Sequence, residues 1–262
     1  MAFKIAVANQ KGGVGKTTTT MELAAILSDE GKKVLALDLD QQCNLTTDLN
    51  ADITLPSIYD LFASDEPELE RAIQRVNDGF DIIAGSSALS KADTEFGDTP
   101  DMYLLSDLLE ALDDRYDYIL IDNGPARNKL LNMSYMAADY FIMCIDSGED
   151  SIKGIDAITT DMMKYHKHGK KSLSDARILG FVMTRYRNTI VGKTIISATE
   201  NMIKEIPEII RVDEPFVMTV REAAVVDESK LLKTTVQKYQ KWSNPAVDYR
   251  KICAEIIKRT EG

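Results

Sequence analysis

The sequence predicts an α/β fold in which a mostly parallel central sheet is flanked by helices on both faces. First, short apolar runs alternate with longer runs of helical periodicity from Met1 to Met183, a pattern typical of parallel sheets covered on both sides. Second, polar residues follow directly after three of the apolar runs, where strand ends form a ligand-binding crevice. Because 262 residues contain no linker or internal repeat, we expect a single domain spanning residues 1–262.

The individual elements are predicted from the length and spacing of the apolar runs. Strands are expected at residues 3–8, 33–39, 80–84, 116–121, 140–145 and 178–183. Helices are expected at residues 19–27, 101–112, 128–138, 152–165, 190–206, 220–227 and 245–258, with weaker signals at 57–63 and 67–76. Residues 85–100 are small and polar and should form a loop, and residues 207–218 should be irregular.

A glycine-rich segment joins the first predicted strand to the first predicted helix. Glycines allow a tight turn, and the N–H groups and positive dipole end of the helix then face an anion. We therefore expect a phosphate-binding loop formed by Lys11, Gly12, Gly13, Val14, Gly15, Lys16, Thr17 and Thr18. Lys16 would bind the β- and γ-phosphates and Thr17 would bind Mg²⁺. Gln10 stands where the usual Walker A spacing has glycine, so the plain pattern is not met, and Lys11 is an additional lysine.

Aspartates follow two further predicted strands. Alternation along residues 33–39 places Asp38 and Asp40 on one side of that strand. Asp122 ends the apolar run 116–121, the Walker B arrangement, in which the carboxylate holds water on Mg²⁺. The carboxyl ends of parallel strands meet at one edge of a sheet, so Lys16, Asp40 and Asp122 should share one crevice. We expect Thr17, Asp40 and Asp122 to hold Mg²⁺, partly through water.

Composition and charge narrow the functional classes. No apolar stretch is long enough to span a bilayer, there is no signal peptide, and the three cysteines lack metal-ligand spacing, so we expect a cytoplasmic protein with reduced thiols. The net charge of −11 argues against a surface that coats nucleic acid. Residues 1–150 contain 11 Lys/Arg and 28 Asp/Glu, a net charge of −17, whereas residues 151–262 contain 20 and 14, a net charge of +6. A polyanion other than the nucleotide would therefore bind to residues 151–262. The alternative is that these cations are only solvent-exposed charges on helix faces.

The motifs resemble those of the ParA/MinD family of P-loop ATPases, whose deviant Walker A box contains the extra lysine. Residues 38–42, Asp-Leu-Asp-Gln-Gln, are similar to the family's D-x-D-P-Q box, with Gln41 in place of proline. Residues 121–125, Ile-Asp-Asn-Gly-Pro, are similar to its I-D-x-P-P box, with Gly124 in place of the first proline. Pro215, followed by Glu222 and Ala223, is similar to the late segment that lies near the adenine. Because the phosphate loop starts at once, the chain resembles the small, Soj-like ParA type without a helix-turn-helix extension.

The resemblance implies a slow ATPase that uses ATP, ADP and Mg²⁺ and forms a homodimer on binding ATP. Lys11 would reach the partner's phosphates, Lys16 would neutralise phosphate charge, and Asp40 would orient the attacking water. These three would be the catalytic residues, and Pro215 would join the phosphate loop in binding the nucleotide. The implied function is partitioning of plasmid or chromosomal DNA, with a ParB-like adaptor and non-specific, nucleoid-associated DNA binding by the ATP dimer.

The family's arginine-rich string after the late proline is absent, since Phe216, Val217 and Thr219 occupy those positions. Non-specific phosphate contacts would then fall to other cations of the C-terminal part. The candidate DNA-binding residues are Lys230, Lys233, Lys238, Lys241, Arg211 and Arg221. Two alternatives stay open: a MinD-like ATPase positioned on a protein scaffold or membrane, and a regulator that binds ATP with little turnover. The last predicted helix has few bulky apolar residues, so we expect it to pack onto the domain rather than insert into a membrane.

Overall fold

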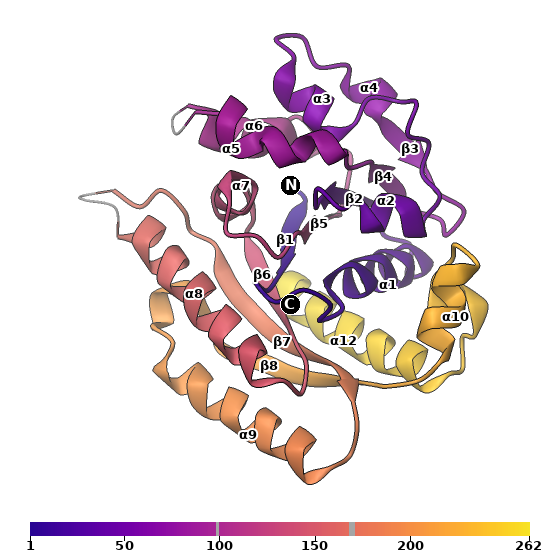
Figure 1. The fold of residues 1–262 in the computed structure, drawn as a ribbon, viewed down its shortest axis with the longest axis vertical. Coiled ribbons are helices and arrows are strands. Elements are labelled where there is room, and N and C mark those ends of the chain that lie inside the picture. The colour runs from indigo at the N-terminus through magenta and orange to yellow at the C-terminus, as the bar shows by residue number, and fades with distance from the viewer. Residues whose placement is uncertain (98–99, 168–170) are drawn as a thin grey trace.

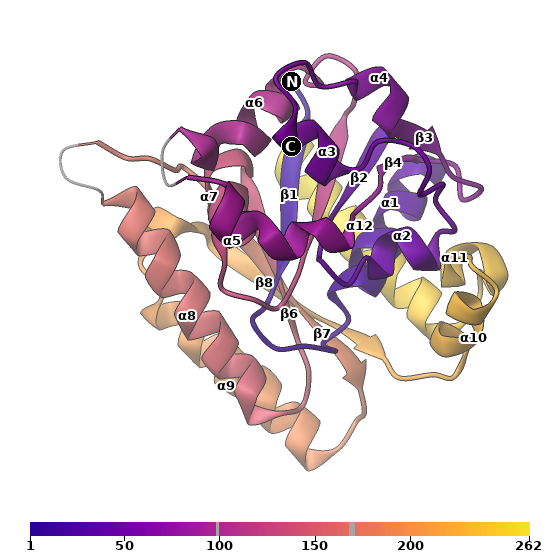
Figure 2. The same cartoon turned by 45° about the horizontal axis from the view of Figure 1, so that its top comes forward.

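The computed structural model describes residues 1–97, 100–167 and 171–262. It contains a sheet of the order β3-β4-β2-β5-β1-β6-β7-β8, in which every described pairing is parallel except that of β3 with β4. Figures 1 and 2 show helices on both faces of this sheet. The predicted fold class is therefore confirmed.

The strands and helices have the following bounds. The strands are β1 Phe3–Ala8, β2 Val34–Leu39, β3 Ile73–Arg75, β4 Asp81–Ile83, β5 Tyr118–Asn123, β6 Tyr140–Ile145, β7 Arg177–Tyr186 and β8 Arg211–Arg221. The longer helices are α1 Lys16–Asp29, α6 Leu104–Glu110, α7 Lys129–Ala137, α8 Glu149–His166, α9 Ile190–Glu205, α10 Val225–Leu231 and α12 Asn244–Glu261. The shorter helices are α2 Asn44–Asp48, α3 Ile58–Ala63, α4 Leu69–Ala72, α5 Ala92–Glu95 and α11 Val236–Tyr239, with 3₁₀ turns at Ser87–Lys91, Asp101–Tyr103 and Glu208–Ile210.

Alternation along the central strands divides the core into two layers. Leu35 and Leu37 of β2 face a cluster that includes α3, α6, α7, α8 and α9. Val34 and Ala36 of the same strand face the other cluster, built from α1 and α12. Both sides of each strand are buried, which explains why the sequence shows continuous apolar runs rather than alternating ones. Residue 252 and its neighbours on α12 pack in the second cluster, so this helix covers the sheet as expected.

Two segments differ from the expectation because pairing with neighbouring strands overrides local pattern. Residues 67–76 were expected to be helical, but they form α4 and then β3, which pairs antiparallel with β4 around a turn at Gly79. Residues 207–218 were expected to be irregular, but they contain most of β8. Pro215 fits within β8 because this is an edge strand, where a missing N–H is tolerated.

Smaller differences concern the lengths of elements. The helix expected at 220–227 begins only at Val225, because β8 continues to Arg221. The loop expected at 85–100 contains a 3₁₀ turn and α5, with Ser86 accepting a hydrogen bond from Ala88 N; residues 98–99 of this loop lie outside the described part. The short α2, directly after Asp40, was not expected at all, although it positions one side of the site.

Candidate functional site

The phosphate loop lies between β1 and α1 and has the backbone that its glycines require. Gly13 and Gly15 have φ angles of 75° and 80°, in the left-handed region that favours glycine. A Cβ atom at Gly15 would lie 2.9 Å from Cγ2 of Thr184. The Thr184 hydroxyl donates a hydrogen bond to the carbonyl oxygen of Val14 over 2.9 Å. Thr184 of β7 therefore packs against the phosphate loop and is hydrogen-bonded to it. This contact was not predicted from the sequence.

Lys16 begins α1 and is buried beside the loop. Its Nζ donates to the carbonyl oxygen of Lys11 over 3.1 Å, across the loop. Burial lowers the pKa of the Lys16 ammonium, while the carboxylates of Asp122 and Asp40 act in the opposite direction. A phosphate chain in the crevice would add further negative charge next to this ammonium, which favours the charged form.

Asp122 lies at the end of β5 and is fully buried, and its Oδ2 atom has no hydrogen-bond partner. Burial raises the pKa of this carboxyl well above its usual range, and the negative charge of Asp38 adds to the rise, whereas a hydrogen bond from Thr17 opposes it. A buried carboxylate oxygen without a partner indicates a missing ligand. Its position beside the Thr17 hydroxyl fits a hydrated Mg²⁺ ion, which prefers oxygen ligands and keeps several waters.

Asp38 and Asp40 have different environments, although they are two residues apart. Asp38 Oδ2 accepts hydrogen bonds from the Thr46 amide at 2.8 Å and the Thr46 hydroxyl at 2.7 Å, and burial raises its pKa to about 6. Asp38 therefore anchors α2. Asp40 lines the cavity and accepts a hydrogen bond from the Gln42 amide at 3.0 Å. A Cβ atom at Gly124 would lie 3.0 Å from Asp40 Oδ1, so glycine here leaves room for this carboxylate.

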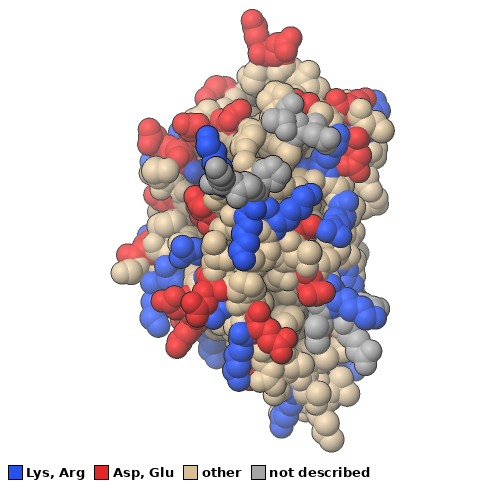
Figure 3. Space-filling view, turned by 90° about the vertical axis from the view of Figure 1, so that its left-hand side faces the viewer, with Lys and Arg blue, Asp and Glu red and all other residues tan. Residues whose placement is uncertain are grey.

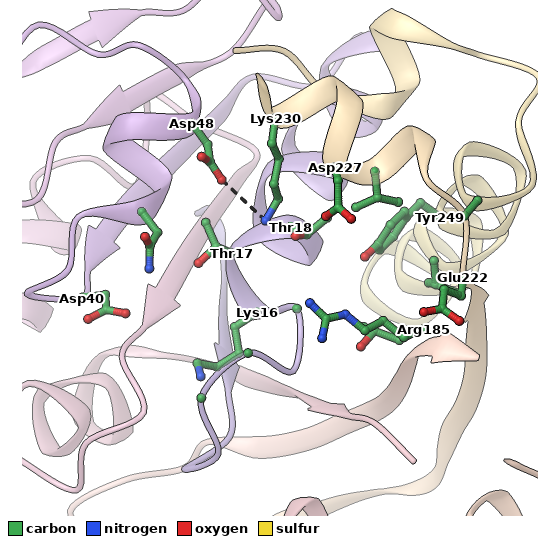
Figure 4. A pocket seen from close by; sticks show the side chains of 18 of the residues that line it. Lys16, Thr17, Thr18, Asp40, Asp48, Arg185, Glu222, Asp227, Lys230 and Tyr249 are labelled. Carbon is green, nitrogen blue, oxygen red and sulfur yellow. Dashed lines mark ion pairs between the residues drawn. The ribbon is translucent and has the colours of Figure 1, made fainter. Parts of the chain in front are cut away.

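The cavity at this site has a volume of about 580 Å³, which suits a nucleotide. Figure 4 shows Lys16, Thr17 and Asp40 toward one end of the cavity, and Glu222 and Tyr249 toward the other. Residues 220–223 and Val226 also line the cavity. Pro215, expected at the nucleotide, is not a lining residue, because it lies five positions earlier in β8. Glu222 and Ala223, which the resemblance placed in the same segment as Pro215, do line the cavity. Sequence reasoning missed Arg185 and Tyr249; only the position of Arg185 after a predicted strand gave a signal.

Lys11 does not line this cavity. Its Nζ forms an ion pair with Asp146, 2.8 Å from Oδ1 and 2.9 Å from Oδ2. A Cβ atom at Gly148 would overlap Lys11 Nζ, so glycine at this position leaves room for the lysine. Lys11 therefore lies outside the chain's own phosphate site, unlike Lys16.

The six predicted DNA-binding residues do not form one free basic surface. Arg221 pairs with Asp248 at 2.7 Å, Lys238 with Asp29 at 2.6 Å and Lys230 with Asp48 at 3.5 Å, while Arg211 donates to backbone carbonyls, including that of Ile206. Lys233 and Lys241 remain exposed.

Lys230 instead spans the mouth of the cavity toward α2 (Figure 4). On another face, which carries α8 and α9, cations and carboxylates are interspersed (Figure 3). Four of the six candidate cations are therefore engaged within the chain, and this part of the DNA-binding expectation is corrected.

A parallel sheet whose first strand leads into a glycine-rich phosphate loop, with a buried aspartate beside the loop lysine, defines the class of P-loop nucleoside triphosphatases. The family model described as an AAA domain (AAA_31) matches residues 2–175. The chromosome partitioning protein ParA of Caulobacter vibrioides is 33% identical over 223 residues, covering 80% of this chain and 82% of that protein. The chain belongs to the ParA/MinD family of P-loop ATPases, as its motifs predicted.

Solved structures agree with this assignment. The septum site-determining protein MinD of Pyrococcus horikoshii, complexed with Mg-ADP, has a TM-score of 0.75 and 26% identity, over 99% of this chain and 97% of that one. Apo McdA of Cyanothece has a TM-score of 0.80 and 22% identity, over 96% of this chain and 99% of that one, and supports the fold. Among the described residues no helix is both long and apolar enough to cross a membrane.

Proposed function

We propose that residues 1–262 act as one ATPase domain that binds Mg-ATP, dimerises in response, hydrolyses ATP slowly and partitions plasmid or chromosomal DNA. The observation that carries this proposal is the placement of two lysines from one loop. Lys16 is buried at the phosphate site, whereas Lys11 lies outside it, paired with Asp146. Because Lys11 does not contact its own phosphate site, we assign it to the nucleotide of a second subunit, where a phosphate would replace Asp146 as its partner.

Each residue of the site has a separate role in this proposal. Lys16 neutralises the β- and γ-phosphates, and Thr17 with Asp122 holds the hydrated Mg²⁺, which supplies charge neutralisation when bound. Asp40 orients the attacking water. A carboxylate is a poor base for this purpose at neutral pH, so intrinsic turnover is slow and a ParB-like adaptor stimulates it. Lys11 from the second subunit adds positive charge in the transition state.

Sizing the protein by light scattering with ATP, with ADP and without nucleotide tests the switch. We expect a dimer of about twice the monomer mass with ATP and a monomer in the other two samples. Phosphate release, measured in parallel, separates the ATPase from a regulator that binds ATP with little turnover. A monomer in all three samples would contradict the dimerisation switch.

DNA binding is the part of the proposal that needs its own test. The exposed cations Lys233 and Lys241 are the candidates for contacts with DNA phosphates. An ATP-bound dimer carries two copies of each on one rigid particle, so DNA binding should require ATP. Because the contacts are electrostatic, binding should disappear at high salt. We expect Lys233→Glu with Lys241→Glu to abolish co-sedimentation with duplex DNA at low salt in a non-hydrolysable ATP analogue. Lys193→Glu with Lys204→Glu, two exposed positions on α9, is the charge-matched control and should retain it.

One observation favours a second candidate, a positioning ATPase whose cargo is a protein scaffold. The same C-terminal segment exposes large apolar side chains, with Leu231 at 83%, Leu232 at 60% and Trp242 at 82% exposure. Exposed apolar groups of this size serve protein contacts better than phosphate contacts. No binding of the wild-type dimer to DNA at low salt would favour this candidate.

A further inference from the structure

Arg185 stands out because its backbone adopts the left-handed conformation, with φ of 50°. Arginine rarely adopts this conformation, and such residues cluster at functional sites where the surroundings hold them in place. Thr184, the preceding residue, is fixed in place by its hydroxyl group. This hydroxyl donates a hydrogen bond to Val14 O at 2.9 Å and lies 3.3 Å from Ile145 O. The pairing of β7 with β8 also shifts register between Met183 and Tyr186. The unusual backbone is therefore fixed directly beside the phosphate loop.

The Arg185 side chain extends into the nucleotide cavity. It is one of the lining residues, and Figure 4 shows its guanidinium turned toward the phosphate loop. In the part of the chain that the structure describes, no hydrogen bond or ion pair holds this guanidinium, although its charge adds to that of Arg187 in lowering the pKa of Glu222. By contrast Arg187, two residues later, is paired with Glu222. An unpaired arginine beside a phosphate loop is available to an anionic ligand.

We propose that Arg185 is a nucleotide-binding residue that contacts the α-phosphate. Figure 4 shows Asp40, which marks the γ-phosphate end, on the opposite side of Lys16 from Arg185. Arg185 thus lies toward the base-side end, with Tyr249 and residues 220–223. Guanidinium groups bind phosphate oxygens through short, charge-assisted hydrogen bonds. The α-phosphate is present in both ATP and ADP, so this contact should contribute equally to the affinity for either nucleotide.

The inference rests on the nucleotide binding proposed above and is independent of DNA. The test measures the Kd of fluorescent ATP and ADP analogues for the wild type and for Arg185→Gly. Glycine adopts a φ of 50° without strain, so the variant should keep its Tm to within about 2 °C. We expect both Kd values to rise about tenfold at low salt.

Salt dependence identifies the contacted group, since a partly exposed guanidinium–phosphate contact is screened by salt. The tenfold deficit should shrink to about threefold between 50 mM and 500 mM salt. Arg177→Ala is the control, because it removes an exposed arginine at the other end of β7 that does not line the cavity, and it should bind both nucleotides like the wild type. Arg185→Asn, which also tolerates the left-handed conformation, should repeat the glycine result.

Three outcomes would overturn the inference: unchanged Kd values, a loss confined to ATP, which would place Arg185 at the γ-phosphate, or a deficit that does not change with salt. Failure of the wild type to bind either nucleotide would instead contradict the proposed function.

Discussion

Glu22 of α1 offers a quantitative test of how the phosphate-loop helix is joined to the C-terminal part. Its side chain is fully buried and accepts hydrogen bonds from the amides of Val236 at 2.5 Å and Gln237 at 3.1 Å, at the start of α11. Asp78 accepts a further bond from Thr235 N at 2.7 Å. Burial raises the pKa of Glu22 from 4.5 to about 7, although the two amides oppose the rise.

The magnitude and sign follow from this pKa. Each tenfold change in proton affinity is worth about 1.4 kcal/mol, so a rise from 4.5 to about 7 corresponds to about 3 kcal/mol. The folded state binds the proton more tightly than the unfolded state. The stabilisation is therefore fully present below pH 4.5 and is lost as the pH rises through 7. Glu22→Gln cannot titrate, so this part of the pH dependence should vanish in the variant.

The assay is urea unfolding of the wild type and Glu22→Gln at several pH values from 4.5 to 8. The free energy of unfolding of the wild type, minus that of the variant, should fall by about 3 kcal/mol across this range. Glu200→Gln, at an exposed position of α9, is the control and should show a nearly constant difference. If the difference for Glu22 is equally constant, then burial does not raise its pKa and the argument fails.

Three further predictions concern the nucleotide site. Lys11→Ala should bind ATP within about threefold of the wild type yet remain monomeric in light scattering, because Lys11 lies outside its own cavity. Asp40→Ala should retain ATP and accumulate as a dimer, with phosphate release reduced about 100-fold; wild-type release would point to Asp38 or Asp122 instead. Gly124→Ala places a Cβ 3.0 Å from Asp40 Oδ1 and should displace this carboxylate, which lowers kcat about tenfold and leaves the ATP affinity unchanged. An unchanged kcat would show that Asp40 accommodates the methyl group.

Much of the fold and of the phosphate site was predictable because its determinants are local. The phosphate loop, the strand endings at Asp40 and Asp122, and the helix–strand alternation all lie within short stretches of sequence. The strand β8 was missed for the opposite reason. Its pairing with β7 depends on Gly180, where a Cβ would overlap the ring of Phe216, and no pattern within residues 207–218 reveals that contact.

The candidate DNA cations show why charge is harder to interpret than periodicity. A basic stretch looks free in sequence when its acidic partners are distant along the chain. Asp29 and Asp48 lie in the acidic N-terminal part, about two hundred residues before Lys238 and Lys230, which they contact. Part of the positive charge of residues 151–262 therefore neutralises carboxylates of residues 1–150 within the chain. A charge difference between two halves of a sequence can thus reflect attraction between the halves, and only the exposed remainder, such as Lys233 and Lys241, is available for an external polyanion.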